Sequence, residues 1–127
     1  MGAKWIKIAV LYFIIGIGFG LFMHYTIQLQ WGATHAHINV VGWLSTGLIG
    51  VIYSIYPRAG NSPLGKLHFW LHQIGLPFLF IGMMMIYFNV PPVVLEIFVS
   101  GGGIAFLLSV ILFVLNVFQN VHEADNK

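Results

Sequence analysis

Four long apolar runs constrain this chain more than any other feature of its sequence. Hydrophobic residues make up 59% of the 127 residues, and charged residues make up only 6%. A soluble domain carries about 25% charged residues, so this composition excludes a water-soluble globule. A helix that crosses a bilayer needs about 20 mainly apolar residues. We expect such helices over about residues 5–28, 34–56, 64–88 and 93–120.

The segments that connect the four runs are short, and their charges predict an orientation. Short connections favour antiparallel neighbours, so we expect an all-α fold, an integral membrane four-helix bundle forming one domain over residues 1–127. Lys4 precedes the first run and Lys7 lies in its first turn, while Arg58 follows the second run and Lys66 lies in the first turn of the third. The segments 29–33 and 89–92 carry no Lys or Arg. The positive-inside rule therefore predicts that both termini lie in the cytoplasm.

Histidine is the residue type that carries chemistry in this chain, which has six histidines and no cysteine. The lack of cysteine excludes disulfides, iron–sulfur clusters and thiolate ligation of haem. A polar side chain in hydrocarbon is costly and is a functional-site candidate by default. Imidazole is also the commonest metal ligand in proteins. The net charge of +2 is small and scattered, so no nucleic-acid partner is expected.

The predicted topology divides the histidines between the two sides of the membrane. His24 ends the first helix and His35 and His37 begin the second, so these three should share one depth on the outer side. His68 and His72 begin the third helix, near the cytoplasmic side. They are four residues apart and share a helix face, which suits a metal ion, a contact with a haem propionate or an interfacial structural role. His35 and His37 point about 200° apart on a regular helix.

The outer histidines are candidate ligands of either a haem or a bare metal ion. His24 with His37, or His24 with His35, can reach one haem iron from opposite sides within a single bundle. Without haem, His24, His35 and His37, together with Glu96, would form a copper or zinc site, because imidazole and carboxylate suit both metals.

Small and aromatic residues follow the outer histidines along the second run. Gly42, Thr46 and Gly50 form a stripe with a spacing of four residues. Such a stripe is typical of close contact between membrane helices. It would also give a smooth wall for a flat cofactor, because glycine lets a ring approach the backbone. Gly42 and Trp43 are therefore candidate cofactor-binding residues.

The second and third runs carry a resemblance to a known protein family. The residues of the second run that carry it are His37-Ile38-Asn39, Trp43, Gly47, Gly50, Ile52-Tyr53 and Tyr56-Pro57. They resemble the second transmembrane helix of subunit I in the haem-copper oxidase superfamily, with the greatest likeness to nitric oxide reductases and C-family oxidases. The third run is similar to the helix that follows in that family, through Lys66, Phe69-Trp70 and Gly75. The chain also looks like short bacterial membrane proteins of the cytochrome-c-oxidase-like type.

The resemblance implies that His37 is an axial ligand of a low-spin haem b. It leaves the second ligand open between His24, a histidine of a second subunit, and an open position that gases reach. The family's catalytic haem and copper ligands lie on later helices, so we expect no reduction of oxygen or nitric oxide and no enzymatic activity. The expected function is electron transfer, or binding of a diatomic gas such as nitric oxide or oxygen.

The expected protein is thus a homo-oligomeric b-type haem protein of the bacterial cytoplasmic (inner) membrane, surrounded by lipid. Two alternatives remain open. One is a copper- or zinc-binding membrane protein without haem, and the other is a non-catalytic scaffold derived from an oxidase subunit.

Overall fold

The computed structural model describes residues 1–123, and in this range four helices are long and apolar enough to cross a membrane. They cover Gly2–Thr26, Leu29–Ile55, Pro63–Met85 and Pro92–Asn120. The prediction of an all-α fold with four long apolar helices is confirmed. The second helix begins about one turn earlier than predicted, because the segment after α1 (Gly2–Thr26) is very short.

Two of the long helices are regular and two contain π-helical segments. The regular ones are α1 and α5 (Pro63–Met85). The second helix consists of η1 (Leu29–Trp31), α2 (Gly32–His37), the π-helical segment η2 (Ile38–Ser45) and α3 (Thr46–Ile55). The fourth consists of α6 (Pro92–Glu96), the π-helical segment η3 (Ile97–Gly101) and α7 (Gly102–Asn120). A short helix, α4 (Pro57–Asn61), joins the second long helix to the third.

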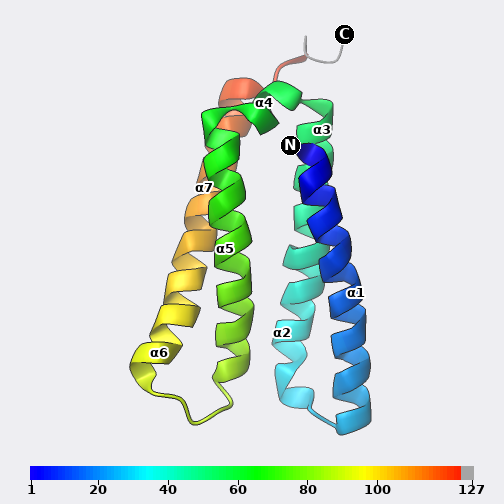
Figure 1. The fold of residues 1–127 in the computed structure, drawn as a ribbon, viewed down its shortest axis with the longest axis vertical. Helices are drawn as coiled ribbons and strands as arrows, with labels where there is room; N and C mark the ends of the chain where they lie inside the picture. The colour runs from blue at the N-terminus through cyan, green and yellow to red at the C-terminus, as the bar shows by residue number, and fades with distance from the viewer. Residues whose placement is uncertain (124–127) are drawn as a thin grey trace.

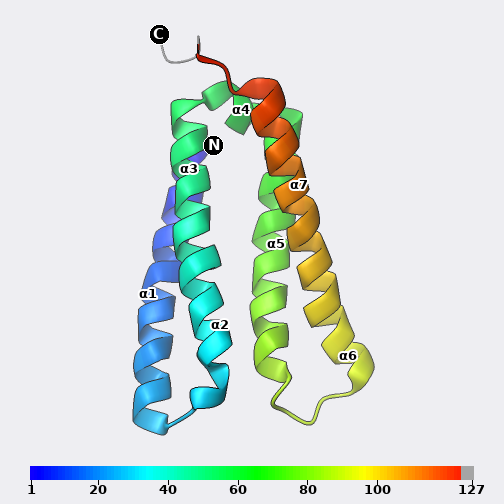
Figure 2. The same cartoon turned by 180° about the vertical axis from the view of Figure 1, so that it is seen from behind.

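The long helices form two antiparallel hairpins (Figure 1). In the first hairpin α1 packs along η2 and α3, and in the second α5 packs along η3 and α7. The helix α4 crosses from one hairpin to the other at the end where the N-terminus lies, as the opposite view also shows (Figure 2). Antiparallel packing within each hairpin is what the short connections predict.

Glycines on the second long helix let the first hairpin pack closely. A Cβ added to Gly42 would lie 2.9 Å from Cγ of Tyr12, and one added to Gly50 would lie 2.8 Å from Cγ1 of Ile6. Both distances are shorter than ordinary van der Waals contact, so a side chain at either position would push α1 away. These two members of the small-residue stripe therefore face α1.

The second hairpin depends on glycines in the same way. A Cβ added to Gly102 would lie 2.5 Å from the backbone nitrogen of Leu79, and one added to Gly75 would lie 2.8 Å from that of Phe106. The near atoms belong to the facing backbone, which cannot turn aside as a flexible side chain can. The spacing of α5 and α7 is therefore fixed by glycine.

The start of α5 positions the histidines of this helix. Ser62 is the N-cap, and its Oγ accepts a hydrogen bond of 2.9 Å from the backbone N–H of Gly65. Pro63 occupies the first helical position, where its missing N–H costs nothing. With the start of the helix fixed, His68 and His72 follow in the second and third turns, four residues apart on one face.

Candidate functional site

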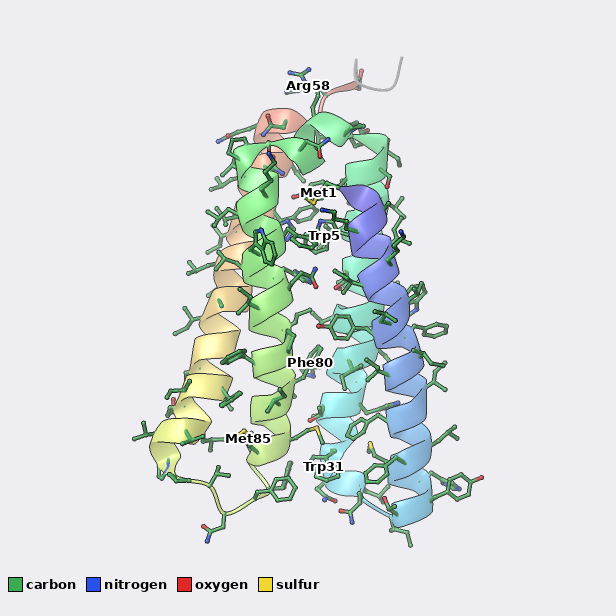
Figure 3. The ribbon with its side chains drawn as sticks, in the orientation of Figure 1. Met1, Trp5, Trp31, Arg58, Phe80 and Met85 are labelled. Carbon is green, nitrogen blue, oxygen red and sulfur yellow. The ribbon has the colours of Figure 1, made fainter. Side chains whose placement is uncertain are left out.

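His68 and His72 lie inside the protein where the two hairpins meet. Their exposed fractions are 0% and 1%. The indole of Trp5 from α1 packs against both rings, with centroids 4.7 Å from His68 and 4.8 Å from His72. The two imidazoles are 5.6 Å apart at an interplanar angle of 84°. Figure 3 shows Trp5 between the hairpins near the α4 end, so it covers the face that the i, i+4 spacing creates.

A first hydrogen-bonded chain connects His68 to three other helices. The hydroxyl oxygen of Tyr53, on α3, lies 2.8 Å from Nδ1 of His68. The side-chain amide of Asn116, on α7, donates to the same hydroxyl oxygen and to the backbone oxygen of Ala59 in α4, both at 2.9 Å. Tyr53 and Asn116 are buried. One polar cluster therefore ties both hairpins and the connection between them.

The same chain continues to the N-cap of α5. The Oδ1 atom of Asn116 lies 2.9 Å from Oγ of Ser62 and accepts a hydrogen bond of 2.8 Å from Nδ2 of Asn120. Ser62 is the residue that begins α5. The position of the two histidines is thus coupled to the side chain of a single asparagine on α7.

A second hydrogen-bonded chain starts at His72. Its Nε2 atom lies 2.9 Å from Oγ1 of Thr46, which is fully buried. The Thr46 hydroxyl also donates to the backbone oxygen of Val41, five residues earlier in the π-helical segment, at 2.9 Å. The imidazole is thereby connected to the irregular part of the second long helix.

Several buried nitrogen atoms at this level have no hydrogen-bond partner within residues 1–123. They are Trp5 Nε1, His68 Nε2, His72 Nδ1 and Gln73 Nε2. Each unpaired buried polar group costs about 1–3 kcal/mol, and three of these nitrogens belong to rings in mutual contact. These three ring nitrogens are therefore hydrogen-bonding groups that the surrounding described residues leave unpaired.

The outer histidines lie in different surroundings. His24 is exposed, and its ring packs edge-on against Tyr25 with centroids 5.1 Å apart. His35 is half-buried against α1, where a Cβ added to Gly20 would lie 2.7 Å from its Nε2 atom. His37 is exposed, so His35 and His37 point to different surroundings, as their spacing predicts.

A metal site built from three or more histidine, aspartate or glutamate side chains is not found in the part of the chain that the structure describes. The predicted copper or zinc ligands His24, His35, His37 and Glu96 are therefore not gathered within one copy over residues 1–123. The carboxylate of Glu96 instead accepts a hydrogen bond from Ser100, one turn later on the same helix.

His37 has the geometry of a free ligand. Its Nδ1 atom lies 2.8 Å from the backbone oxygen of Ala33. A carbonyl oxygen only accepts hydrogen bonds, so Nδ1 carries a proton, and in the neutral imidazole Nε2 then keeps a lone pair. Metal-ligating histidines are typically held in this way by a carbonyl or carboxylate. Together with Ala36, Val40 and Val41, His37 lines a shallow depression of about 200 Å³ on the surface.

The candidate cofactor-binding residues Gly42 and Trp43 both take part in packing within the first hairpin. Gly42 is buried against Tyr12. The indole of Trp43 stacks on Phe13 of α1, with ring centroids 4.7 Å apart at 24°. Both residues therefore make contacts that fix η2 against α1, one turn after His37.

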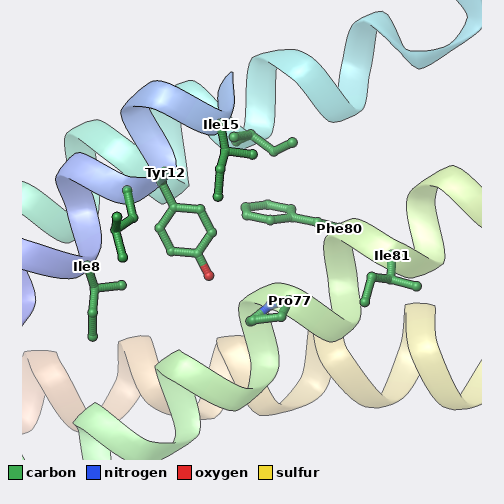
Figure 4. A pocket seen from close by; sticks show the side chains of 8 residues that line it. Ile8, Tyr12, Ile15, Pro77, Phe80 and Ile81 are labelled. Carbon is green, nitrogen blue, oxygen red and sulfur yellow. The ribbon is translucent and has the colours of Figure 1, made fainter. Parts of the chain in front are cut away.

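An apolar groove of about 450 Å³ lies between the hairpins (Figure 4). Its walls are Ile8, Leu11, Tyr12, Ile15 and Ile38 on one side and Pro77, Phe80 and Ile81 on the other. The rings of Tyr12 and Phe80 meet edge to face across it, with centroids 5.7 Å apart. Its lining lacks histidine and carboxylate side chains, so it offers space without a ligand for metal.

Comparison of the chain with protein-family models, with curated proteins and with solved structures finds no match. The resemblance to haem-copper oxidases is therefore carried only by the sequence motifs described above.

Sequence reasoning missed several members of the buried cluster. Trp5 was treated only as part of an apolar helix, and Tyr53 only as part of a family motif. Asn116 was passed over, although an amide near the end of an apolar helix is a signal of internal hydrogen bonding. Thr46 was recognised as a small residue, and its hydroxyl was not assigned to a histidine.

Proposed function

We propose that this chain is a membrane-embedded b-type haem protein in which His37 supplies an axial ligand. The hydrogen bonding of the His37 imidazole supports this proposal most directly. Nδ1 is held by the backbone oxygen of Ala33 at 2.8 Å, which leaves the lone pair of Nε2 on an exposed side chain. His37 also lies eight positions along the helix from Leu29, about 12 Å, within a segment apolar enough to cross a membrane. A polar side chain in such a segment is a functional-site candidate.

The helix face around His37 suits a flat apolar group. Val40, Leu44 and Leu48 follow His37 at intervals of three and four residues, and they are 54%, 61% and 58% exposed. Val40 lines the same surface depression as His37, and Leu44 and Leu48 add exposed apolar surface further along the same helix. Porphyrin and a second copy of the chain can both cover such a surface, and lipid surrounds the rest.

A homo-oligomer completes the site in this proposal. His24 is exposed and makes its ring contact with its own neighbour Tyr25, so it is accessible to a haem held by another copy. Two axial histidines would give a haem suited to electron transfer, and one would leave a position for nitric oxide or oxygen. With both termini in the cytoplasm of a bacterial cell, His37 would lie toward the outer side of the inner membrane.

The test is the visible spectrum of the protein purified from a haem-replete host. We expect a Soret band that is lost in His37→Ala and retained in His122→Ala, since His122 is exposed and lies beyond α7. Spectra of the reduced and nitric-oxide-treated protein then report the coordination number. A wild-type protein without a Soret band, or an unchanged band in His37→Ala, contradicts the proposal. Stoichiometric copper or zinc without haem would favour the bare metal site.

A further inference from the structure

We propose that Trp5, His68 and His72 bind one water molecule between the hairpins. This water joins the two hydrogen-bonded chains into a single chain whose donors all point the same way. The site is separate from His37 and does not rest on the proposed haem function.

The three rings form a closed triangle of contacts. Their centroids lie 4.7, 4.8 and 5.6 Å apart, and all three side chains are almost completely shielded from the surroundings. Each ring contributes one buried nitrogen that lacks a hydrogen-bond partner within residues 1–123. A buried water makes two to four hydrogen bonds, and these three nitrogens are the groups that the proposal assigns to it.

The position of the proton on His72 follows from Thr46. The hydroxyl has a single proton and makes two hydrogen bonds, to the backbone oxygen of Val41 and to Nε2 of His72. Because the carbonyl oxygen can only accept, both bonds exist together only if His72 donates from Nε2–H. The free Nδ1 atom of His72 is therefore an acceptor.

The position of the proton on His68 follows from Tyr53. The phenol oxygen already accepts from the amide of Asn116 and lies 2.8 Å from Nδ1 of His68. If His68 donated to this oxygen, the phenol proton would be buried without an acceptor. The fully satisfied arrangement has Tyr53 donating to Nδ1, so the proton of His68 is on Nε2. The free Nε2–H group of His68 is therefore a donor.

Two donors and one acceptor match a water molecule and not a metal ion. The indole N–H of Trp5 is a donor only, and His68 offers a second N–H group. A water accepts from both and donates to Nδ1 of His72. A cation needs lone pairs on both histidines, which would strand the phenol proton of Tyr53, and it would be repelled by the indole N–H.

The completed chain is polarised in one direction. Tyr53 donates to His68, His68 to the water, the water to His72, His72 to Thr46, and Thr46 to a backbone oxygen in the π-helical segment. Aligned donors strengthen one another in a medium of low dielectric constant. The water thus couples the α4 end of the molecule to the segment that follows His37.

Solid-state NMR of the full chain in lipid bilayers, labelled with ¹⁵N at histidine and tryptophan, tests the proposal. We expect both His68 and His72 to carry their proton on Nε2. We also expect magnetisation transfer from water to the N–H groups of Trp5 and His68, with no shift of either imidazole when zinc is added. A proton on Nδ1 of either residue, absent transfer from water, or a zinc-induced shift of both imidazoles overturns the proposal.

Two variants distinguish the proposed proton positions on His68 and His72 from simple burial of the two imidazoles. Tyr53→Phe removes the proton donor to His68, so the single tautomer of His68 should be lost while His72 keeps its own. Tyr25→Phe is the matched control, because Tyr25 is 80% exposed and remote from the cluster, and it should change neither imidazole. If His68 keeps its tautomer in a folded Tyr53→Phe protein, the polarised chain is wrong.

Discussion

The hydroxyl oxygen of Tyr53 lies 2.8 Å from Nδ1 of His68, and this contact joins one helical hairpin to the other. Tyr53 belongs to α3 and His68 to α5, and their exposed fractions are 1% and 0%. Neither side chain reaches the surroundings, so Nδ1 of His68 depends on the Tyr53 hydroxyl for its hydrogen bond. The docking of the hairpins is therefore sensitive to changes of a single atom at this point.

Removing the Tyr53 hydroxyl should destabilise the protein. In Tyr53→Phe, Nδ1 of His68 loses its partner and the amide of Asn116 loses one acceptor, at a cost of about 1–3 kcal/mol for each unpaired buried group. Denaturant unfolding in detergent micelles measures the difference. Tyr25→Phe serves as the control and should change stability by less than about 0.5 kcal/mol. Equal stability of the two variants would contradict the buried bond.

The Thr46 hydroxyl should matter more than the neighbouring hydroxyl of Ser45. Thr46→Val keeps the shape of the side chain and removes the partner of His72 Nε2, so we expect a loss of about 1–3 kcal/mol. Thr46→Ser should keep most of the wild-type stability, because serine retains the hydroxyl. The Ser45 hydroxyl bonds only the Val40 backbone oxygen within the described residues, so Ser45→Ala should cost clearly less. Thermal unfolding followed by circular dichroism ranks the three variants.

Asn116 should be more sensitive to substitution than Asn120, one turn later. Asn116→Ala removes donors to Tyr53 and Ala59 and an acceptor for two further groups, and we expect a loss of about 2–4 kcal/mol from several unpaired groups. Asn120→Ala removes one bond from a partly buried residue, and a loss below about 1 kcal/mol is expected. Unfolding midpoints in detergent compare the two variants. A larger loss of stability in Asn120→Ala than in Asn116→Ala would argue against the hydrogen-bonded cluster around Asn116.

Adjacent glycines offer a test of the packing of the second hairpin. A Cβ at Gly102 would lie 2.5 Å from the backbone nitrogen of Leu79, whereas one at Gly101 meets no atom within 4 Å in the described structure. Gly102→Ala should therefore cost about 1–3 kcal/mol through overpacking. Gly101→Ala should be neutral or stabilising by up to about 1 kcal/mol, because alanine favours helix. Unfolding curves of the two variants, measured side by side, compare their stabilities. Similar losses of stability in both variants would contradict this spacing of α5 and α7.

The local geometry of the histidines was predictable, and their surroundings were not. Spacing alone indicated that His68 and His72 share a face and that His35 and His37 do not, because side-chain direction repeats every 3.6 residues along a helix. Their burial depends on which element covers that face, and Trp5 does so from more than sixty residues away in the sequence. The topology predicts only that the inner pair lies near the cytoplasmic side, and the structure adds that both rings are buried in the protein interior.

The π-helical geometry of the second long helix also could not be predicted from the local sequence. The residues of η2 carry no proline, and nothing in their order marks a π-helical segment. The segment ends at Ser45, and the hydroxyl of the next residue, Thr46, bonds both the backbone five residues earlier and the imidazole of His72. The irregularity accompanies a tertiary contact, so it could not be read from the second helix by itself.

The apolar runs alone were enough to predict the long helices seen within residues 1–123, because hydrocarbon tolerates backbone only when its polar groups bond within a helix. It also determined which side chains share a helix face. The tertiary structure alone decided that Trp5, Tyr53, Thr46 and Asn116 surround His68 and His72. Polar partners in such a core come from different helices, and their meeting depends on how the hairpins dock rather than on any local pattern.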